Sequence, residues 1–533
     1  MERAQGGRPS GLVGRVSAMA GELEAAAAPL LIFLALLVLG LWNLGGPAPW
    51  WDEGWTLSVA RSAAERGFYG RMLLGEPAPP GLEAAPIVTL PVAGALRLLG
   101  VGLWQGRVYG AVCAAAAVTL LWALGERLYG RRAGWGALAA ALLLSMHPQL
   151  NPLIQGRQVL GEMPMLLALL GGYACLLAAL RGRWLWVAPA ALLWAAALIT
   201  KAQALPFWTA SLAAALGAAL LLRQWRAAGL VALAGAAANL GQGSLGAAVW
   251  WLMPPVVPGR EELAGLMEVI AVVPRAFNRL YALEVLLLFG LPTVGALMWA
   301  LWREARALPR GGGDAGAVAR WALLGLAWSW LAWYALLSVG VPRYLLPVAL
   351  VGALFLGALL RDLTGGLDPR ATLAAMAAPL RRGGPAPATA GGRWSWAGAW
   401  LAALIVAAAL PLTALSYARY YVERDHAAER VAAFLNTRTP PEAVVETYES
   451  ELHFLLERPY HYPPDPVHVA LNRRGLLGEA GAGVDYDPLA ADPDYLVVGI
   501  FARGNDLYAP ALDSGAFRSV LRDGDYEVFE RVR

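Results

Sequence analysis

Two adjacent carboxylates follow the first long apolar run of the chain. The run covers 25–44, and Asp52 and Glu53 come soon after it in the segment PAPWWDEGWT, between Trp51 and Trp55. A carboxylate here could act as a general base that takes a proton from an attacking hydroxyl. It could equally end a solvated loop or cap the helix predicted for EGWTLSVARSAAERG. We expect Glu53 to orient Asp52, to bind a cation or to cap that helix.

Further polar residues stand where other apolar runs end. Such residues near the surface of a bilayer are costly and usually face a cavity or a partner. Arginine suits a phosphate through its forked donors, whereas lysine offers a compact charge. Lys201 is the only lysine among 42 basic residues, which indicates a specific requirement for lysine at that position. The other polar residues of this group are His147, Arg157, Glu162, Arg275, Asn278, Arg279, Arg343 and Tyr344.

The apolar runs that must position these residues predict an all-α polytopic membrane protein. Of 533 residues, 58% are hydrophobic and only 15% are charged, more apolar than a soluble domain of this length needs. Runs long enough to cross a hydrocarbon core of ~30 Å indicate about eleven spans. The predicted spans are 26–45, 104–124, 133–147, 162–180, 184–200, 203–222, 228–252, 281–302, 319–338, 342–360 and 396–417.

Loop charge predicts the orientation of the spans. If the ambiguous run 86–100 does not cross, the loops GERLYGRRAG, RGRW, RQWRAAG and WREARALPRGGGD all fall on one side, which is arginine-rich and therefore cytoplasmic. We therefore interpret 86–100 as a re-entrant or surface-lying helix. The helix after Asp52, with Arg61, Arg66 and Arg71 in the same loop, is expected to lie on the outer membrane surface.

Three segments fall outside the predicted spans. Residues 1–25 form a cytoplasmic tail, and the Pro/Gly/Arg-rich stretch 361–394 is a cytoplasmic linker within the 26–419 membrane domain. Residues 420–533 predict a small extracytoplasmic α/β domain. Its expected strands are AVVETY, VHVAL, YLVVGI and YEVFERV, and its expected helices are DHAAERVAAFLN and ESELHFLLER.

The order of these motifs resembles the GT-C glycosyltransferases. The DE pair after the first span, the R-x-x-x-x-E motif ending at Glu162, the TK at Lys201 and the RYLLP beginning at Arg343 are similar to the bacterial branch related to protein O-mannosyltransferases and aminoarabinose transferases. The resemblance covers about 25–420. The second acidic position holds Glu162 where relatives often have Asp, and the tail lacks the cysteine or repeat pattern of a lectin-like module.

The resemblance implies a membrane enzyme with an outer active site. It would move a hexose or pentose from a polyprenyl-phosphate-linked donor to a hydroxyl of an extracytoplasmic protein, lipid or glycan, with inversion. Asp52 is the base that it implies. Glu53 and Glu162 are further candidate catalytic residues, and Trp51, Trp55 and Tyr344 are candidate contacts for the acceptor or sugar. The candidate phosphate ligands are Lys201, Arg343, Arg157 and Arg279.

Simpler structural roles stand beside these assignments. Glu162 could cap the start of its span, Arg157 could pair with Glu162, and Lys201 could extend to the bilayer interface. Tyr344 fits an aromatic belt, and His147 fits a boundary histidine better than a metal ligand. The tail motif ETYESELHFLLERPYHYPPD is acidic and aromatic enough to bind sugar, although packing is the better interpretation.

Two other classes of function compete with the enzyme. A transporter or lipid flippase would also be polytopic, but it should show paired halves or polar groups near the bilayer midplane. A scaffold for the outer domain would leave the boundary charges unexplained. No cofactor is required, a divalent metal ion is possible at the acids, and no nucleic-acid partner is expected. Cys113 and Cys175 lie in apolar runs and predict no disulfide framework.

Overall fold

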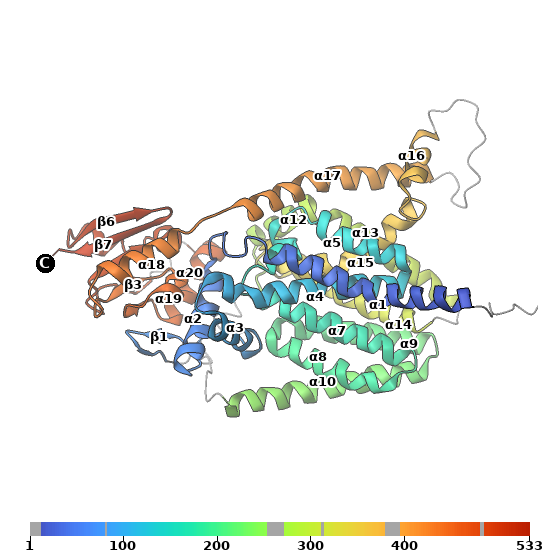
Figure 1. The fold of residues 1–533 in the computed structure, drawn as a ribbon, viewed down its shortest axis with the longest axis horizontal. Helices are drawn as coiled ribbons and strands as arrows, with labels where there is room; N and C mark the ends of the chain where they lie inside the picture. Colours follow the sequence, from blue (N-terminus) through green and yellow to red (C-terminus); the bar gives the residue numbers. More distant parts are fainter. Residues whose placement is uncertain are drawn as a thin grey trace, which may run out of the picture.

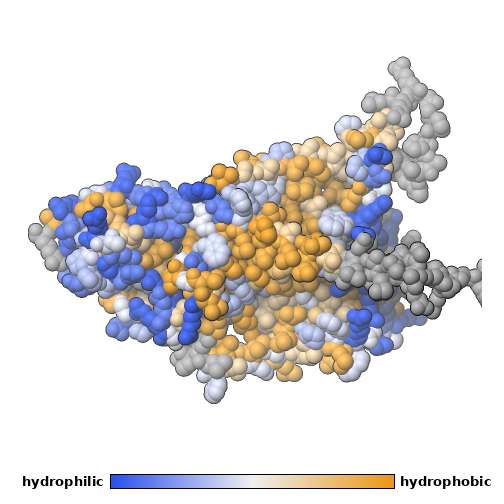
Figure 2. Space-filling model, in the orientation of Figure 1, coloured by the Kyte–Doolittle hydropathy of each residue, from blue (hydrophilic) through white to orange (hydrophobic). Residues whose placement is uncertain are grey.

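The structure, a computed structural model, describes residues 12–79, 81, 83–252, 271–310, 314–378, 395–479 and 484–532. Figure 1 shows long helices running side by side and a smaller part with a β-sheet beyond one end of them. Figure 2 shows apolar side chains over the helical bundle and mainly hydrophilic ones over the smaller part. The predicted fold class, an all-α membrane bundle with a small C-terminal α/β domain, is confirmed.

Each predicted span overlaps a helix. The helices of the bundle are α1 (Leu12–Leu41), α3 (Pro86–Leu99), α4 (Leu103–Tyr129), α5 (Arg131–Leu143), α7 (Glu162–Leu180), α8 (Val187–Thr200), α9 (Leu205–Leu221), α10 (Trp225–Leu252), α12 (Ala276–Val285), α13 (Leu291–Ala307), α14 (Ala315–Leu336), α15 (Leu346–Leu363), α16 (Pro369–Ala377) and α17 (Ser395–Val422). Short helical turns join or extend them: η1 (Pro148–Leu150), α6 (Pro152–Gln155), η2 (Trp184–Trp186), η3 (Ala202–Ala204), η4 (Leu286–Gly290), η5 (Leu308–Arg310) and η6 (Pro342–Leu345).

Length and composition together single out fewer spans than the sequence predicts. Within the described residues, six helical stretches are long and apolar enough to cross a membrane, and they are 103–129, 162–180, 202–221, 276–307, 342–363 and 396–438. The count of eleven spans stays a prediction. Helix α3 has 14 residues and a length of about 21 Å, too short to cross a bilayer, in agreement with the interpretation of 86–100.

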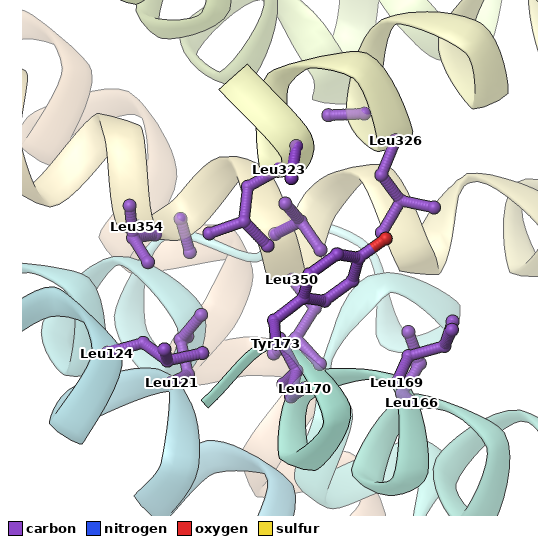
Figure 3. Packing of buried hydrophobic residues seen from close by; sticks show 14 of the residues in the cluster. Leu121, Leu124, Leu166, Leu169, Leu170, Tyr173, Leu323, Leu326, Leu350 and Leu354 are labelled. Carbon is purple, nitrogen blue, oxygen red and sulfur yellow. The ribbon is translucent and has the colours of Figure 1, made fainter. Parts of the chain in front are cut away.

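The bundle core packs through leucines and small residues. Figure 3 shows Tyr173 of α7 among leucines of α4, α7, α14 and α15. The Tyr173 hydroxyl donates to Ser211 Oγ at 2.7 Å, and Ser211 Oγ donates to the Ala322 carbonyl at 2.7 Å, so the buried hydroxyls are satisfied. Helices α5 and α15 touch at Gly136 and Gly357, because small residues let helix backbones approach closely in a membrane.

Helices extend into two segments that were predicted to lie outside the spans. Helix α1 already begins at Leu12, within an Ala- and Glu-containing stretch of good helix formers, and the boundary of the cytoplasmic tail at residue 25 stays a prediction. The linker 361–394 is partly helical: α16 begins after Asp368, whose carboxylate accepts from the Arg370 and Ala371 amides at 2.8 and 3.2 Å. Residues 379–394 of that linker lie outside the described residues.

The C-terminal part is a mixed five-stranded sheet with helices. Its strands are β3 (Val445–Thr447), β4 (Tyr460–His461), β5 (Tyr495–Val498), β6 (Phe517–Asp523) and β7 (Tyr526–Arg531), in the order β4-β3-β5-β7-β6. Strand β3 pairs in parallel with β4 and β5, while β7 pairs antiparallel with β5 and β6. Its helices are α18 (Ala427–Arg438), α19 (Ser450–Leu455), α20 (Asp465–Leu477), α21 (Ile500–Gly504) and α22 (Ala509–Asp513).

One predicted strand of this domain is wrong. The segment VHVAL, 467–471, belongs to helix α20. The preceding sequence explains this, because Pro466 lies in the first turn, where proline favours a helix start, and Asp465 places a negative charge at the helix N-terminus. The predicted strands AVVETY, YLVVGI and YEVFERV and both predicted helices are confirmed.

The helix that follows Asp52 is buried under the C-terminal domain. Helix α2 (Trp51–Arg66) packs against α19 on one side and α3 on another, so it lies between the C-terminal domain and the bundle, and its expected place at the outer membrane surface stays a prediction. Arg61 donates to the carbonyls of Phe454 and Leu456 at 2.7 and 2.9 Å. Arg71, in the loop before the short hairpin of β1 (Met72–Leu73) and β2 (Glu76–Pro77), pairs with Asp465 through two bonds of 2.8 and 2.9 Å.

A buried ion pair fixes the start of α2. Arg107 of α4 and Glu53 are 1% and 0% exposed, and two guanidinium nitrogens of Arg107 each lie 2.7 Å from a carboxylate oxygen of Glu53. Arg107 also donates to the carbonyls of Leu44, Pro47 and Ala48, which lie in the loop between α1 and α2. The Val159 amide donates to Glu53 at 3.2 Å, which ties the loop before α7 to the same carboxylate.

Gly54 makes the contact with α19 possible. A Cβ on Gly54 would lie 2.2 Å from the Glu451 nitrogen and 2.5 Å from the Ser450 carbonyl carbon, both backbone atoms that cannot rotate away. The neighbouring Trp51 donates its indole N–H to the Tyr448 carbonyl at 2.8 Å. The first turn of α2 therefore holds the C-terminal domain against the bundle.

We predict that Gly54→Ala weakens the contact between α2 and α19. The added methyl group must displace backbone, so amide hydrogen exchange in α19 should become faster and thermal stability should fall. The matched control is Gly94→Ala in α3, where a Cβ meets nothing within 4 Å and alanine is the better helix former. Equal exchange of α19 in the two variants would contradict this account.

We predict that Arg107→Gln strongly destabilises the protein, because it leaves the buried Glu53 carboxylate without its partner, a loss of about 3–5 kcal/mol. The control is Arg303→Gln, since Arg303 and Asp362 form an exposed pair at 3.2 Å that should contribute about 0–1 kcal/mol. Midpoints of thermal unfolding in detergent measure both. Adding Glu53→Gln to Arg107→Gln should recover part of the loss. Similar midpoints for Arg107→Gln and Arg303→Gln would refute the role of the pair.

Candidate active site at one end of the helical bundle

Four charged residues from four separate elements meet at the end of the bundle that faces the C-terminal domain. Asp52 lies in the first turn of α2, Glu162 is the first residue of α7, Lys201 follows the last residue of α8, and Arg343 lies in η6. The structure therefore brings together four of the residues that the sequence singled out. All four sit at or next to the end of a helix.

Ion pairs connect the four residues in a row. Lys201 Nζ lies 2.5 Å from Glu162 Oε1, and Arg343 Nε lies 3.4 Å from the same oxygen. Arg343 Nη1 lies 2.6 Å from Asp52 Oδ2. The order along the row is thus Lys201, Glu162, Arg343, Asp52, with two positive and two negative charges in alternation.

The row is buried at its centre and open at both ends. The side chains of Glu162 and Arg343 are 6% and 15% exposed, whereas those of Lys201 and Asp52 are 26% and 42% exposed. Two polar atoms at the centre, Glu162 Oε2 and Arg343 Nε, are buried without a hydrogen-bond partner among the described residues. Buried polar atoms are rarely left so, and such atoms suit a site that receives a polar ligand.

Asp52 is held in its ionised form. Burial on its own would raise the pKa of Asp52, but the Arg343 guanidinium holds it below its usual value. Only Oδ2 is bonded to Arg343; within the described residues Oδ1 accepts no hydrogen bond. A carboxylate that is ionised, partly exposed and free at one oxygen can accept a proton from a hydroxyl.

The C-terminal domain contributes an aromatic wall beside Asp52. The His468 ring stacks on Trp51 with centroids 4.4 Å apart, and Trp51 stacks on Trp55 at 5.0 Å. His468 Nδ1 lies 2.8 Å from the Tyr448 hydroxyl, and burial lowers the pKa of His468 to about 4, so this ring is neutral at neutral pH. The structure thus places Trp51 and Trp55, 6% and 7% exposed, in a packed core instead of on an open sugar-binding surface.

Glu53 and Arg157 contact residues outside the row of four charges. Glu53 accepts from the Trp50 amide at 3.3 Å, a capping contact, and its carboxylate pairs with Arg107 instead of with a residue of the row. The expected pair of Arg157 with Glu162 is absent from the described residues. Arg157 instead donates to the Asn43 carbonyl and lies 4.7 Å above the Tyr421 ring.

Arg279, Tyr344 and His147 are not members of the row of four charges. Arg279 donates to the Ala335 carbonyl at 2.8 Å, at the C-terminal end of α14, where a cation is favourable, and no contact with the row is seen in the described residues. The Tyr344 ring lies 5.6 Å from the Arg343 guanidinium. His147 Nδ1 accepts from the Gln149 amide at 3.2 Å, which fits a boundary histidine.

The acids of the tail motif are buried and bonded. Glu446 accepts from the hydroxyls of Tyr486 and Tyr508 at 2.6 and 2.9 Å, and Glu449 accepts from the Ala502 amide at 2.8 Å. Burial and repulsion from Glu451 raise the pKa of Glu449. These contacts support packing over sugar binding for the motif. In the described residues, no group of three or more metal-binding side chains is present.

Sequence reasoning missed Arg107, Gln149 and His468. The signal for Arg107 was available, since it is a charge inside the predicted span 104–124. Gln149 Oε1 accepts from the Arg343 amide at 3.2 Å, and His468 covers Trp51 from a separate domain. Nothing local in the sequence indicates either contact.

The chain is similar to one protein family and to several solved structures. Residues 83–241 match the family model described as dolichyl-phosphate-mannose-protein mannosyltransferase. No curated protein sequence matches the chain. The structure is similar to ArnT from Cupriavidus metallidurans bound to undecaprenyl phosphate, with a TM-score of 0.63 and 17% identity over 95% of this chain and 98% of that one.

A second similarity is more distant. The archaeal oligosaccharyltransferase AglB from Archaeoglobus fulgidus, in complex with an inhibitory peptide and a dolichol-phosphate, gives a TM-score of 0.51 and 13% identity over 93% of this chain and 73% of that one. At these identities the likeness shows the fold. Together, the structural matches confirm the predicted GT-C fold of a membrane protein. Residues 83–241 are similar to the protein mannosyltransferase family model, in line with the predicted resemblance.

Proposed function

We propose that the protein is a membrane glycosyltransferase that moves a sugar from a polyprenyl-phosphate-linked donor to a hydroxyl of an extracytoplasmic acceptor. The observation that carries the proposal is the row Lys201, Glu162, Arg343, Asp52. It combines a free carboxylate oxygen with two cations at one end of an apolar bundle. That Cupriavidus ArnT was solved with undecaprenyl phosphate on the same fold supports a lipid phosphate as the donor group.

The reaction requires one base and a stabilised leaving group. In the proposed step, Asp52 Oδ1 takes the proton of the acceptor hydroxyl while its oxygen attacks the anomeric carbon. The bond from that carbon to the phosphate oxygen breaks, and the phosphate leaves with one more negative charge. A single displacement of this kind inverts the anomeric centre. Hexosyl and pentosyl donors are both compatible with it.

Lys201 and Arg343 are proposed to hold the leaving phosphate. The charge on the phosphate grows as the glycosidic bond breaks, so fixed cations stabilise the transition state more than the bound donor. Both cations are now neutralised by Glu162 and Asp52, which keep them in place before the donor arrives. Arg343 also links the two halves of the reaction, since it contacts the base and faces the phosphate site.

The proposed orientation follows from the loop charges. The arginine-rich loops and the N-terminus face the cytoplasm of a cell membrane, and the row and the C-terminal domain from about 420 face outward. A lipid-borne donor then meets the row at the outer bilayer surface. The transporter alternative is weaker, because the row lies at helix ends and not near the middle of a span.

We predict that Asp52→Asn lowers sugar transfer by about 100-fold to 10,000-fold, the contribution of a general base, with a nearly unchanged unfolding midpoint. The assay follows labelled sugar from polyprenyl-phosphate-linked hexoses and pentoses into cell-envelope material. Glu65→Gln on the same helix is the control, since Glu65 is 40% exposed and pairs only with Arg61 in the described residues, and it should keep full activity. Undiminished transfer by Asp52→Asn would remove Asp52 as the base.

A further inference from the structure

A large groove lies between α4, α7 and α8, away from the row of charges. Its volume is about 840 Å³, within the size range of small-molecule sites. Most of its wall is apolar. The residues that form this wall include Leu120, Leu167, Gly171, Ala174, Cys175 and Leu193.

Three arginines and a tryptophan line the same groove at one end. Arg127 lies in the last turn of α4, Arg181 directly follows α7, and Arg183 and Trp186 lie in the connection to α8. All three arginines are exposed, and none of them forms an ion pair in the part of the chain that the structure describes. Arg181 donates to the Arg127 backbone carbonyl at 2.7 Å, which holds the Arg181 side chain beside the C-terminal end of α4.

The cationic end of the groove lies at the opposite membrane surface from the row. Helix α7 begins with Glu162 and ends just before Arg181, so its 19 residues separate the two by about 28 Å. This distance is close to the thickness of the hydrocarbon core. The groove therefore runs from arginines and a tryptophan at a bilayer interface into the apolar interior.

We propose that this groove binds an anionic phospholipid, with its phosphate at Arg127, Arg181 and Arg183 and an acyl chain along the apolar wall. Three guanidinium groups that form no ion pair in the described residues line one end of an apolar groove, and their positive charge complements an anionic headgroup. Basic pockets between membrane helices are suited to anionic headgroups. Trp186 stands at the depth where aromatic side chains meet headgroups. The lipid site does not depend on the proposed sugar transfer.

The test is native mass spectrometry of the full-length protein with phosphatidylglycerol or phosphatidylcholine added at equal concentrations. Phosphatidylglycerol should bind at least tenfold more tightly than phosphatidylcholine. The triple variant Arg127→Gln, Arg181→Gln, Arg183→Gln should abolish this preference. The matched control replaces Arg131, Arg132 and Arg226, which are exposed and do not line the groove, and it should retain the preference. If both triple variants lost the preference for phosphatidylglycerol equally, the preference would come from general surface charge, and the proposal would be overturned.

Two further experiments test whether the molecule bound in the groove is a phospholipid. Ala174→Phe fills the apolar wall without changing charge, so it should weaken phosphatidylglycerol binding even if the triple variant fails to fold. Inorganic phosphate should not compete, because it lacks the chain that the groove takes. Competition by inorganic phosphate, unchanged binding by Ala174→Phe, or displacement of phosphatidylglycerol by low concentrations of polyprenyl phosphate would each contradict a phospholipid site.

Discussion

The buried ion pair between Arg107 and Glu53 is the interaction on which the candidate site depends. Arg107 collects three carbonyls of the loop before α2, and Glu53 accepts from the Val159 amide in the loop before α7. The pair thus joins α2, α4 and the chain leading to Glu162. Two charges that are almost completely excluded from solvent tolerate little movement, because either one alone would be buried without a partner.

Four consecutive residues of α2 each make a separate contact. Trp51 packs on the C-terminal domain, Asp52 faces Arg343, Glu53 faces Arg107, and Gly54 lies against the backbone of α19. Successive residues of a helix point about 100° apart, so one turn can serve all four contacts. The fixed direction of Glu53 therefore also sets that of Asp52. The C-terminal domain, by covering Trp51, closes one side of the space around the base.

Much of this arrangement could be predicted from the sequence. Apolar runs placed the helices, and charges at the ends of these runs pointed to Asp52, Glu162, Lys201 and Arg343, because charged residues are rarely tolerated at membrane depth without a purpose. The parts that failed depend on contacts between distant segments. Sequence pattern could not show that α2 lies under α19, that Arg157 turns to Asn43 and Tyr421, or that VHVAL is helical within its domain. The sequence assigned different roles to the two acids of the DE pair, but only the packing shows that Glu53 is buried against Arg107 while Asp52 is partly exposed.

The proposed function requires that the row receive the lipid phosphate beside Asp52. A high-resolution structure of the protein in nanodiscs containing polyprenyl phosphate tests it most directly. We expect a phosphate oxygen within hydrogen-bond distance, about 2.7–3.2 Å, of Lys201 Nζ or the Arg343 guanidinium, with Asp52 Oδ1 facing the same space. A phosphate bound elsewhere in the bundle, with the ion pairs of Lys201, Glu162, Arg343 and Asp52 unchanged, would contradict it.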